Sequence, residues 1–290
     1  MTHPHHNPGR PIHLNFGQET VTAFSISALA TYALVPELNC AFDMGECPLE
    51  AVPLEHVFLT HAHGDHARCL LRHESLRRLM GMSPATYYVP EETLAGMQGL
   101  AEAWRTLEMV KPHKWHPPQF EALAPGGVVW LHRQLAAKAF RVQHTLPSLG
   151  YTLYDVRKKL KAEFQGTPGP ELARLRREGV AFEEELWVPR LTFIGDSTIE
   201  TLYREPHVGQ SRILFLEVTF LLDGEQEMAR KRGHTHLDDL LTFLKAQPDT
   251  LQNEHIVLKH FSMRYEKRLI LKVLEQKLPA DFRERVHILL

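Results

Sequence analysis

The stretch Val57-Phe58-Leu59-Thr60-His61-Ala62-His63-Gly64-Asp65-His66 decides the fold of this 290-residue chain. Its first four residues are apolar or β-branched and predict a short buried strand. The turn that follows holds three histidines and one aspartate within six positions. Imidazole nitrogens and carboxylate oxygens both suit zinc, and spacings of one and two residues let side chains of one tight loop point at two nearby ions. The stretch therefore predicts a metal centre at the end of a strand.

A second histidine-rich segment, Met1-Thr2-His3-Pro4-His5-His6, stands at the N-terminus. Prolines surround it and no strand precedes it, as is typical of histidine tracts that are merely solvated. We expect residues 1–12 to form a flexible tail. The strand before His61, and the Gly and Asp inside its cluster, argue against the same interpretation for residues 57–66.

The composition is that of a globular protein, which we expect to form one domain over residues 1–290. Hydrophobic residues make up 43% of the chain, and 33 basic residues nearly balance 35 acidic ones. No overall charge therefore points to nucleic acid or a membrane surface, and a polyanion would be bound by local patches. Three cysteines without paired spacing favour a reducing compartment, and no apolar run has the length of a signal peptide or membrane span. The sequence predicts a cytoplasmic location.

Predicted strands and helices alternate along most of the chain. Strands are expected at 21–26, 30–35, 40–45, 57–60, 85–89, within 123–142, and at 190–194, 212–220 and 255–258. Helices are expected at 67–80, 91–109, 237–244 and 266–277. This order predicts an α/β protein built as a four-layer αββα sandwich, with polar residues gathered at one edge. Residues 151–187, rich in charge and interrupted by glycine and proline, are expected to be an inserted helical segment.

Three further candidate ligands, His144, Asp196 and His260, stand near the ends of predicted strands. A hydrolytic metal centre needs ligands from several strand ends, because one coordination position must stay open for water. Each residue alone has an ordinary structural explanation, since lone histidines are often core residues and Gly-Asp is a common turn. Together with residues 61–66 they favour a metal site.

The order of motifs resembles that of ribonuclease Z, the tRNA 3′-end endonucleases of the metallo-β-lactamase superfamily. The motifs are His-x-His-x-Asp-His at 61–66, His144 with Gly150-Tyr151, Gly195-Asp196, Glu217-Val218-Thr219-Phe220, Gly233-His234, and His260-Phe261-Ser262-Met263-Arg264-Tyr265. The last is the most diagnostic, because a His followed by Ser-x-Arg-Tyr is typical of ribonuclease Z and not of β-lactamases or glyoxalases. The short plant-type enzymes look nearest, through Ala41 to Pro48 and Gly233-His234-Thr235-His236.

The resemblance implies a dinuclear zinc centre in an αββα metallo-β-lactamase sandwich. It implies that His61, His63 and His144 hold one zinc ion, that Asp65, His66 and His260 hold the second, and that Asp196 bridges both. Manganese or iron would also suit these ligand types. Asp65 is further implied to orient or deprotonate the attacking water.

His234 is implied to act on the leaving oxygen as a general acid, with Glu217 as its partner. A carboxylate beside an imidazole keeps the ring charged, as this role requires. The alternative is structural: His234 and His236 flank Thr235, a residue suited to capping a helix that begins near Leu237. Which of the two histidines faces the site stays open.

Basic residues cluster at 157–161, 174–177 and 230–232. Such clusters could neutralise phosphates, although solubility is an equally ordinary reason for basic helix surfaces. Arg264, whose guanidinium can fork onto two oxygens, is a candidate phosphate contact together with Ser262, Lys231 and Arg232. Residues 151–187 stand where ribonuclease Z carries its tRNA-gripping arm, and they look shorter than that arm.

We therefore expect a metal-dependent hydrolase, a dinuclear endoribonuclease that removes the 3′ trailer from precursor tRNA. The resemblance also implies a homodimer. A hydrolase of a small phosphodiester, ester or thioester on the same scaffold is the alternative. A non-catalytic binding module is a third hypothesis, against which the complete set of seven ligands argues.

Overall fold

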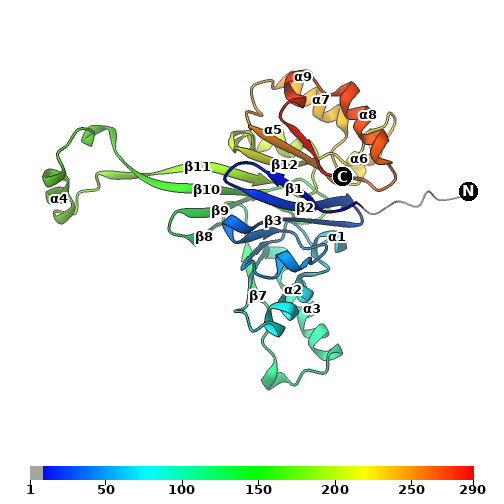
Figure 1. The fold of residues 1–290 in the computed structure, drawn as a ribbon, viewed down its shortest axis with the longest axis horizontal. Coiled ribbons are helices and arrows are strands. Elements are labelled where there is room, and N and C mark those ends of the chain that lie inside the picture. The colour runs from blue at the N-terminus through cyan, green and yellow to red at the C-terminus, as the bar shows by residue number, and fades with distance from the viewer. Residues whose placement is uncertain (1–8) are drawn as a thin grey trace, which may run out of the picture.

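Two mixed β-sheets face each other and carry helices on their outer sides (Figure 1), in a computed structural model that describes residues 9–290. The first sheet has the order β1-β2-β3-β4-β5-β6-β7, with β14 paired to β2, and the second has the order β15-β13-β12-β11-β10-β9-β8. The predicted α/β class and four-layer αββα sandwich are confirmed.

The strands of the first sheet are β1 (Ile12–Asn15), β2 (Thr20–Ser27), β3 (Ala30–Val35), β4 (Cys40–Phe42), β5 (His56–Phe58), β6 (Thr86–Pro90), β7 (Gln119–Leu123) and β14 (Phe261–Ser262). Those of the second are β8 (Val128–His132), β9 (Leu135–Arg141), β10 (Leu149–Leu160), β11 (Glu183–Phe193), β12 (Ile213–Glu217), β13 (His255–Lys259) and β15 (Val286–Ile288). The helices are α1 (Gly64–Ala67), α2 (Leu70–Leu79), α3 (Leu94–Leu107), α4 (Gly169–Arg177), α5 (Glu200–Arg204), α6 (Gln226–Lys231), α7 (Leu237–Ala246), α8 (Lys267–Lys277) and α9 (Ala280–Arg283).

Side chains alternate between the two faces of each sheet, and the buried ones form three apolar layers: one between the sheets and one on the outer face of each sheet. Aromatic rings fill the space between the sheets, where Phe42 stacks on Phe193 with ring centroids 4.9 Å apart. On the outer face of the second sheet, α5, α7, α8 and α9 bury their apolar sides. On the outer face of the first, α2 packs through Leu70 into the apolar layer that includes β3 and β5, and α3 packs on β7. Each sheet therefore buries both faces, which explains why strands such as β5 read as continuous apolar runs.

Two of the predicted helices differ from the observed ones in their bounds, and one of them also differs in how it packs. The helix expected at 67–80 is α2, which begins three residues later, at Leu70. The helix expected at 91–109 is a short 3₁₀ turn followed by α3. On α3, Met97 and Ala101 are buried, whereas Leu100, Trp104 and Leu107 are exposed. The apolar stripe on which that prediction rested therefore faces solvent over part of its length. Within residues 9–290, no helix is long and apolar enough to span a membrane.

The segment expected to be a helical insertion begins and ends as strand and holds one helix, α4, between the strands, so the prediction was wrong for both ends of the segment. β10 and β11 pair antiparallel from Tyr151 opposite Phe193 to Leu160 opposite Glu183, and they extend beyond the sandwich as a two-stranded arm with α4 at its far end (Figure 1). Both faces of the ribbon are solvated, so its strands carry the charges that suggested a solvated helix. Lys159 faces Glu184 across the ribbon at 3.1 Å, an arrangement that stabilises a strand pair.

The expected N-terminal tail falls largely outside the described residues, which begin at Gly9. Its predicted end at residue 12 is one residue too far, because Ile12 already pairs with Ala23 in β1.

Candidate metal centre

One edge of the sandwich collects the carboxyl ends of several strands. Residues 61–66 follow β5, His144 follows β9, Asp196 follows β11, and His260 follows β13. Parallel pairing of β11, β12 and β13 brings their ends to the same edge, and the β4, β5 and β6 ends meet them from the other sheet. Polar side chains far apart in sequence thus converge, as open parallel sheets arrange them.

The seven candidate ligands form two adjoining groups. His61, His63, His144 and Asp196 form one group and Asp65, His66 and His260 the other, with one ligand atom per residue lying within 4.8 Å of the others in its group. Asp196 Oδ2 lies between the groups, 3.8 Å from His61 Nε2, 3.4 Å from His66 Nε2 and 3.3 Å from His260 Nε2.

The chemistry of this donor set fits a metal site. Five imidazoles and two carboxylates are ligands that divalent transition metals accept. Asp196 Oδ1 is buried and has no hydrogen-bond partner among the described residues. A buried carboxylate oxygen without a donor is costly, and a cation between the groups would satisfy it.

The electrostatics of the groups support the same conclusion. Burial lowers the pKa of His61 well below its ordinary value, and the charge of His66 lowers it further. Burial opposes ionisation of Asp196, but the charges of His260 and His66 hold its pKa well below the usual range. A neutral imidazole and an ionised carboxylate are the forms that bind metals. His66 differs: burial would lower its pKa, yet Asp196 and Asp43 raise it to about 10, so a proton and a metal ion compete for this ring.

Hydrogen bonds on the outer ring nitrogens fix four of the five histidines. In His61, Nδ1 bonds to Thr60 Oγ1 at 3.0 Å, and in His66 it bonds to Asp43 Oδ2 at 2.7 Å. In His144, Nδ1 bonds to the Gly233 carbonyl at 2.8 Å, and in His260 it bonds to Thr219 Oγ1 at 3.0 Å. Each ring therefore turns Nε2 toward the centre. His63 is the exception and turns Nδ1 inward, 3.1 Å from His61 Nε2. Such outer bonds set the tautomer and the orientation of metal-binding histidines.

His234 lies at the rim of the centre, and His236 does not. His234 Nδ1 donates to Glu217 Oε1 at 3.0 Å, and its ring centroid is 5.5 Å from that of His260. Burial would lower the pKa of His234, but the Glu217 carboxylate raises it above the ordinary value. His236 is buried elsewhere, with Nε2 on the Leu222 carbonyl and Nδ1 accepting from Asp238 N as the N-cap of α7.

The capping alternative for Thr235 is therefore wrong, since its hydroxyl donates to the Ser197 carbonyl and His236 caps the helix. Glu217 is held in place from several sides. Its oxygens accept from the backbone N–H groups of Ser197, Thr219 and Thr235 at 2.8–3.1 Å.

Comparisons with known proteins agree with these motifs. No family model matches the chain. It is 31% identical over 248 residues to the chloroplastic tRNase Z of Arabidopsis thaliana, covering 84% of this chain and 68% of that protein. A second Arabidopsis tRNase Z is also 31% identical over 248 residues, covering 84% of this chain and 86% of that protein. The chain belongs to the tRNase Z family, also named ribonuclease Z.

Solved structures show the same fold. The short form of human tRNase Z superimposes with a TM-score of 0.55 at 21% identity, over 84% of this chain and 93% of that one. A metallo-β-lactamase fold protein of Bacillus subtilis reaches a TM-score of 0.62 at 12% identity, over 92% and 95% of the two chains. The resemblance of the motifs to ribonuclease Z, and to its plant members, is confirmed.

Asp43, to which the sequence analysis assigned no role, supports the centre. Its buried carboxylate accepts from Thr60 N at 2.8 Å and contacts His66 Nδ1 at 2.7 Å. The turn after it is tight, because a Cβ on Gly45 would lie 1.9 Å from the Asp65 carbonyl oxygen. An Asp-x-Gly at the end of a buried strand next to the metal-binding strand was the available signal.

Asp43→Asn is expected to weaken metal binding by roughly 10- to 100-fold. The amide oxygen can still accept from Thr60, but the amide N–H groups then face His66 Nδ1, which moves the ring proton to Nε2, where the metal would bind. Titration against a competing chelator measures the effect, with exposed Asp249→Asn as the control. Equal affinities in the two variants would show that Asp43 has no influence on the metal site.

The candidate phosphate contacts stand next to His234 and His260 in the sequence. Arg264 Nη2 donates to Glu225 Oε1 at 2.8 Å and Nε to Ser262 Oγ at 3.2 Å, and the side chain is half exposed. Lys231 and Arg232, exposed just before His234, form no ion pair with any residue from 9 to 290. Their position leaves them available to an anionic substrate.

Proposed function

We propose that this chain is a metal-dependent endoribonuclease that removes the 3′ trailer from precursor tRNA with two zinc ions. The observation that carries this proposal is the position of Asp196 Oδ2 within 3.8 Å of histidines from both ligand groups, beside a His234 that pairs with Glu217. Two adjacent cation sites and a charged imidazole at their rim suit the hydrolysis of a phosphodiester.

One ion would be held by His61, His63 and His144. The other ion would be held by Asp65, His66 and His260, and Asp196 would bind both ions. Bound ions of this kind lower the pKa of water and offset negative charge on a phosphate. Asp65 keeps one oxygen fixed by Ala28 N at 2.8 Å. Burial would raise the pKa of Asp65, but its hydrogen bond to His260 and the charge of His66 lower it to about 2. The carboxylate is therefore ionised near neutral pH and can accept a hydrogen bond from the attacking water, which it orients.

His234 would supply the proton for the leaving oxygen. As the water oxygen bonds to phosphorus, the water gives one proton to the Asp65 carboxylate. The bond from phosphorus to the 3′-oxygen of the mature tRNA breaks, and that oxygen takes the proton from the His234 imidazolium. Glu217 stabilises the charged ring before the transfer, because its buried carboxylate lies 3.0 Å from Nδ1.

The arm extends far enough from the sandwich to contact a large substrate (Figure 1). Its charge, however, is balanced: residues 155–185 hold seven basic and seven acidic side chains. Five of the basic ones pair with carboxylates of the arm itself, namely Arg157, Lys158, Lys159, Arg174 and Arg176. Lys161 and Arg177 remain without such a pair among the described residues, so the arm would neutralise few phosphates and add little to the salt dependence of tRNA binding.

Homodimer formation, which the family resemblance implies, would use the exposed stripe of α3. Leu100, Trp104 and Leu107 are 48%, 40% and 75% exposed and follow one another at helical spacing. An apolar stripe of this kind packs against its own copy across a two-fold axis. Trp104→Glu is expected to shift the protein from dimer to monomer in sedimentation, whereas Ala95→Glu on the same helix is not. A monomeric wild-type protein, or a dimeric Trp104→Glu variant, would contradict this interface.

A cytoplasmic location is also part of the proposal. It is supported by the three cysteines of the chain, all of which are free thiols, as expected in a reducing compartment.

Cleavage of a 3′-extended precursor tRNA by the zinc-loaded protein tests the function directly. Bis(p-nitrophenyl) phosphate is assayed in parallel, and Asp65→Ala is the control that removes the water-orienting carboxylate. We expect cleavage of both substrates by the wild type and of neither by the variant. Cleavage of the small diester alone would replace the tRNA substrate by a small phosphodiester, and cleavage of neither would reject the phosphodiesterase.

A further inference from the structure

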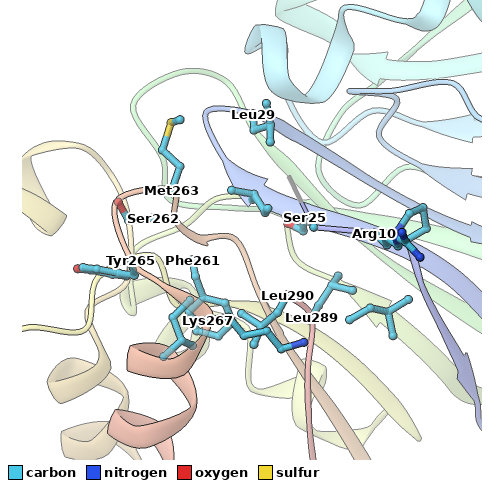
Figure 2. A pocket seen from close by; sticks show the side chains of 15 residues that line it. Arg10, Ser25, Leu29, Phe261, Ser262, Met263, Tyr265, Lys267, Leu289 and Leu290 are labelled. Atoms are coloured by element: carbon cyan, nitrogen blue, oxygen red, sulfur yellow. The ribbon is translucent and has the colours of Figure 1, made fainter. Parts of the chain in front are cut away.

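A cavity of about 630 Å³ opens between the β2–β3 turn, the segment that follows His260 and the start of α8 (Figure 2). Its wall includes Ser25 and Leu29 on one side and Ser262, Met263 and Lys267 on the other. Cavities that bind small ligands have volumes in this range. None of the proposed metal ligands lines it.

Two walls of the cavity also support the metal centre. Ala28 donates its backbone N–H to Asp65 Oδ2, and the next residue, Leu29, lines the cavity. Phe261 and Ser262 directly follow His260 and line the cavity as well, held by parallel pairing of β14 with β2. A molecule in the cavity would therefore lie next to a phosphate bound at the centre.

The lining combines apolar surface with unpaired positive charge. Ile26, Leu29, Phe261, Met263 and Leu289 supply apolar groups, and Ser25 and Ser262 supply hydroxyls. Arg10 and Lys267 are exposed at its border, and neither forms an ion pair with a described residue. Figure 2 shows Arg10 and Lys267 reaching the cavity from different elements, the segment before β1 and helix α8.

This combination fits one nucleotide. A base has two apolar faces and hydrogen-bonding edges, which match a wall of aliphatic and aromatic side chains with a few hydroxyls. A phosphate matches two cations that pair with no carboxylate among residues 9–290. An apolar ligand without charge would leave the two cations without a role, and a bare anion would leave the apolar wall without one.

We propose that this cavity binds the nucleotide adjoining the scissile phosphate, with its base against Leu29, Phe261 and Met263. The next phosphate of the chain lies at Arg10 and Lys267. The inference rests on the proposed phosphodiesterase function and adds to it a binding site for one nucleotide of the substrate. It makes the centre selective for nucleic acid over diesters that lack a nucleoside.

Binding of uridine 3′,5′-bisphosphate to the zinc-loaded full chain tests the assignment, measured by isothermal titration calorimetry with inorganic phosphate as the comparison ligand. Arg10→Gln/Lys267→Gln removes both lining cations. Arg268→Gln/Lys272→Gln is the matched control, because it removes one exposed arginine and one exposed lysine of α8 that do not line the cavity.

We expect the lining variant to bind the bisphosphate about tenfold more weakly than the wild type. The control variant should bind it as the wild type does, and both variants should bind inorganic phosphate alike. A third variant, Leu29→Glu, places a carboxylate in the apolar wall and should weaken bisphosphate binding by at least as much. Equal bisphosphate affinity in the wild type and the lining variant, or no binding by the wild type, would overturn the assignment.

Hydrolysis of bis(p-nitrophenyl) phosphate by the wild type separates this inference from the proposed function. If the ester is cleaved while bisphosphate binding ignores Arg10 and Lys267, the phosphodiesterase stands and the nucleotide site is wrong. If no diester is cleaved while bisphosphate binding depends on both cations, the nucleotide site stands and the proposed reaction is wrong.

Discussion

Replacing Asp196 with asparagine is expected to remove metal from both halves of the centre and to lower the rate of diester hydrolysis by more than about 100-fold. Its Oδ2 atom is the one that approaches histidines of both groups. A neutral amide is a weaker ligand, and its N–H groups would occupy space that a cation shares with the neighbouring ring nitrogens. The effect should exceed that of Asp43→Asn, because Asp43 acts on the centre indirectly, by its contacts with His66 and with the Thr60 hydroxyl that bonds to His61.

Metal content per chain and the rate for bis(p-nitrophenyl) phosphate measure this effect. Exposed Asp281→Asn serves as the control for the loss of one carboxylate. We expect two ions per chain in the wild type and in the control, and fewer than one in Asp196→Asn. A variant that keeps both ions and most of its rate would show that Asp196 does not bridge the two groups.

His234→Ala is expected to lower the cleavage of precursor tRNA by roughly 10²- to 10⁴-fold, the usual contribution of a general acid. The ribose 3′-oxygen is a poor leaving group and needs a proton as its bond to phosphorus breaks. Nitrophenolate is a stable anion and leaves without one. Bis(p-nitrophenyl) phosphate should therefore be hydrolysed by the variant at nearly the wild-type rate, and an equal loss for both substrates would assign His234 to metal or phosphate binding instead.

The pH dependence gives an independent test of the same role. The pKa of His234 is raised by Glu217, so the imidazolium persists to higher pH than an isolated histidine and is lost as the pH rises through the raised value. Glu217→Gln removes the negative charge and lowers that pKa. The alkaline limb of kcat/KM for precursor tRNA should move to lower pH in Glu217→Gln, and a limb that stays in place would exclude the Glu217–His234 pair as its origin.

The sequence indicated which residues converge at one edge of the sandwich better than it indicated what surrounds them. Residues 61–66 follow a strand whose apolar run is hard to mistake, and the remaining ligands stand directly after other strands, so the fold brings them together wherever the strand order is right. Asp43 was missed because an aspartate after a strand is equally typical of an ordinary turn. Only the pairing of β4 with β5, a tertiary contact, places it beside Thr60 and His66.

The choice between His234 and His236 could not be made from spacing either. The two residues belong to one short connection between α6 and α7, and it is the start of α7 at Leu237 that turns His236 inward as a cap. The arm was misjudged for a different reason. Charge density indicates exposure to solvent, and both an isolated helix and an isolated two-stranded ribbon are exposed.

The ligands of the centre come from widely separated parts of the chain, and this has a consequence for its assembly. His66 and His260 stand 194 residues apart in sequence, with their Nε2 atoms 3.4 Å apart in the folded protein. Contacts of such long sequence separation form late in folding, after both sheets have packed. Residues 61–66 are made first, but a metal site rarely exists before the chain around it folds. Because Asp196, His234 and His260 join residues 61–66 only when the second sheet docks, we expect the complete centre to form only in the folded chain.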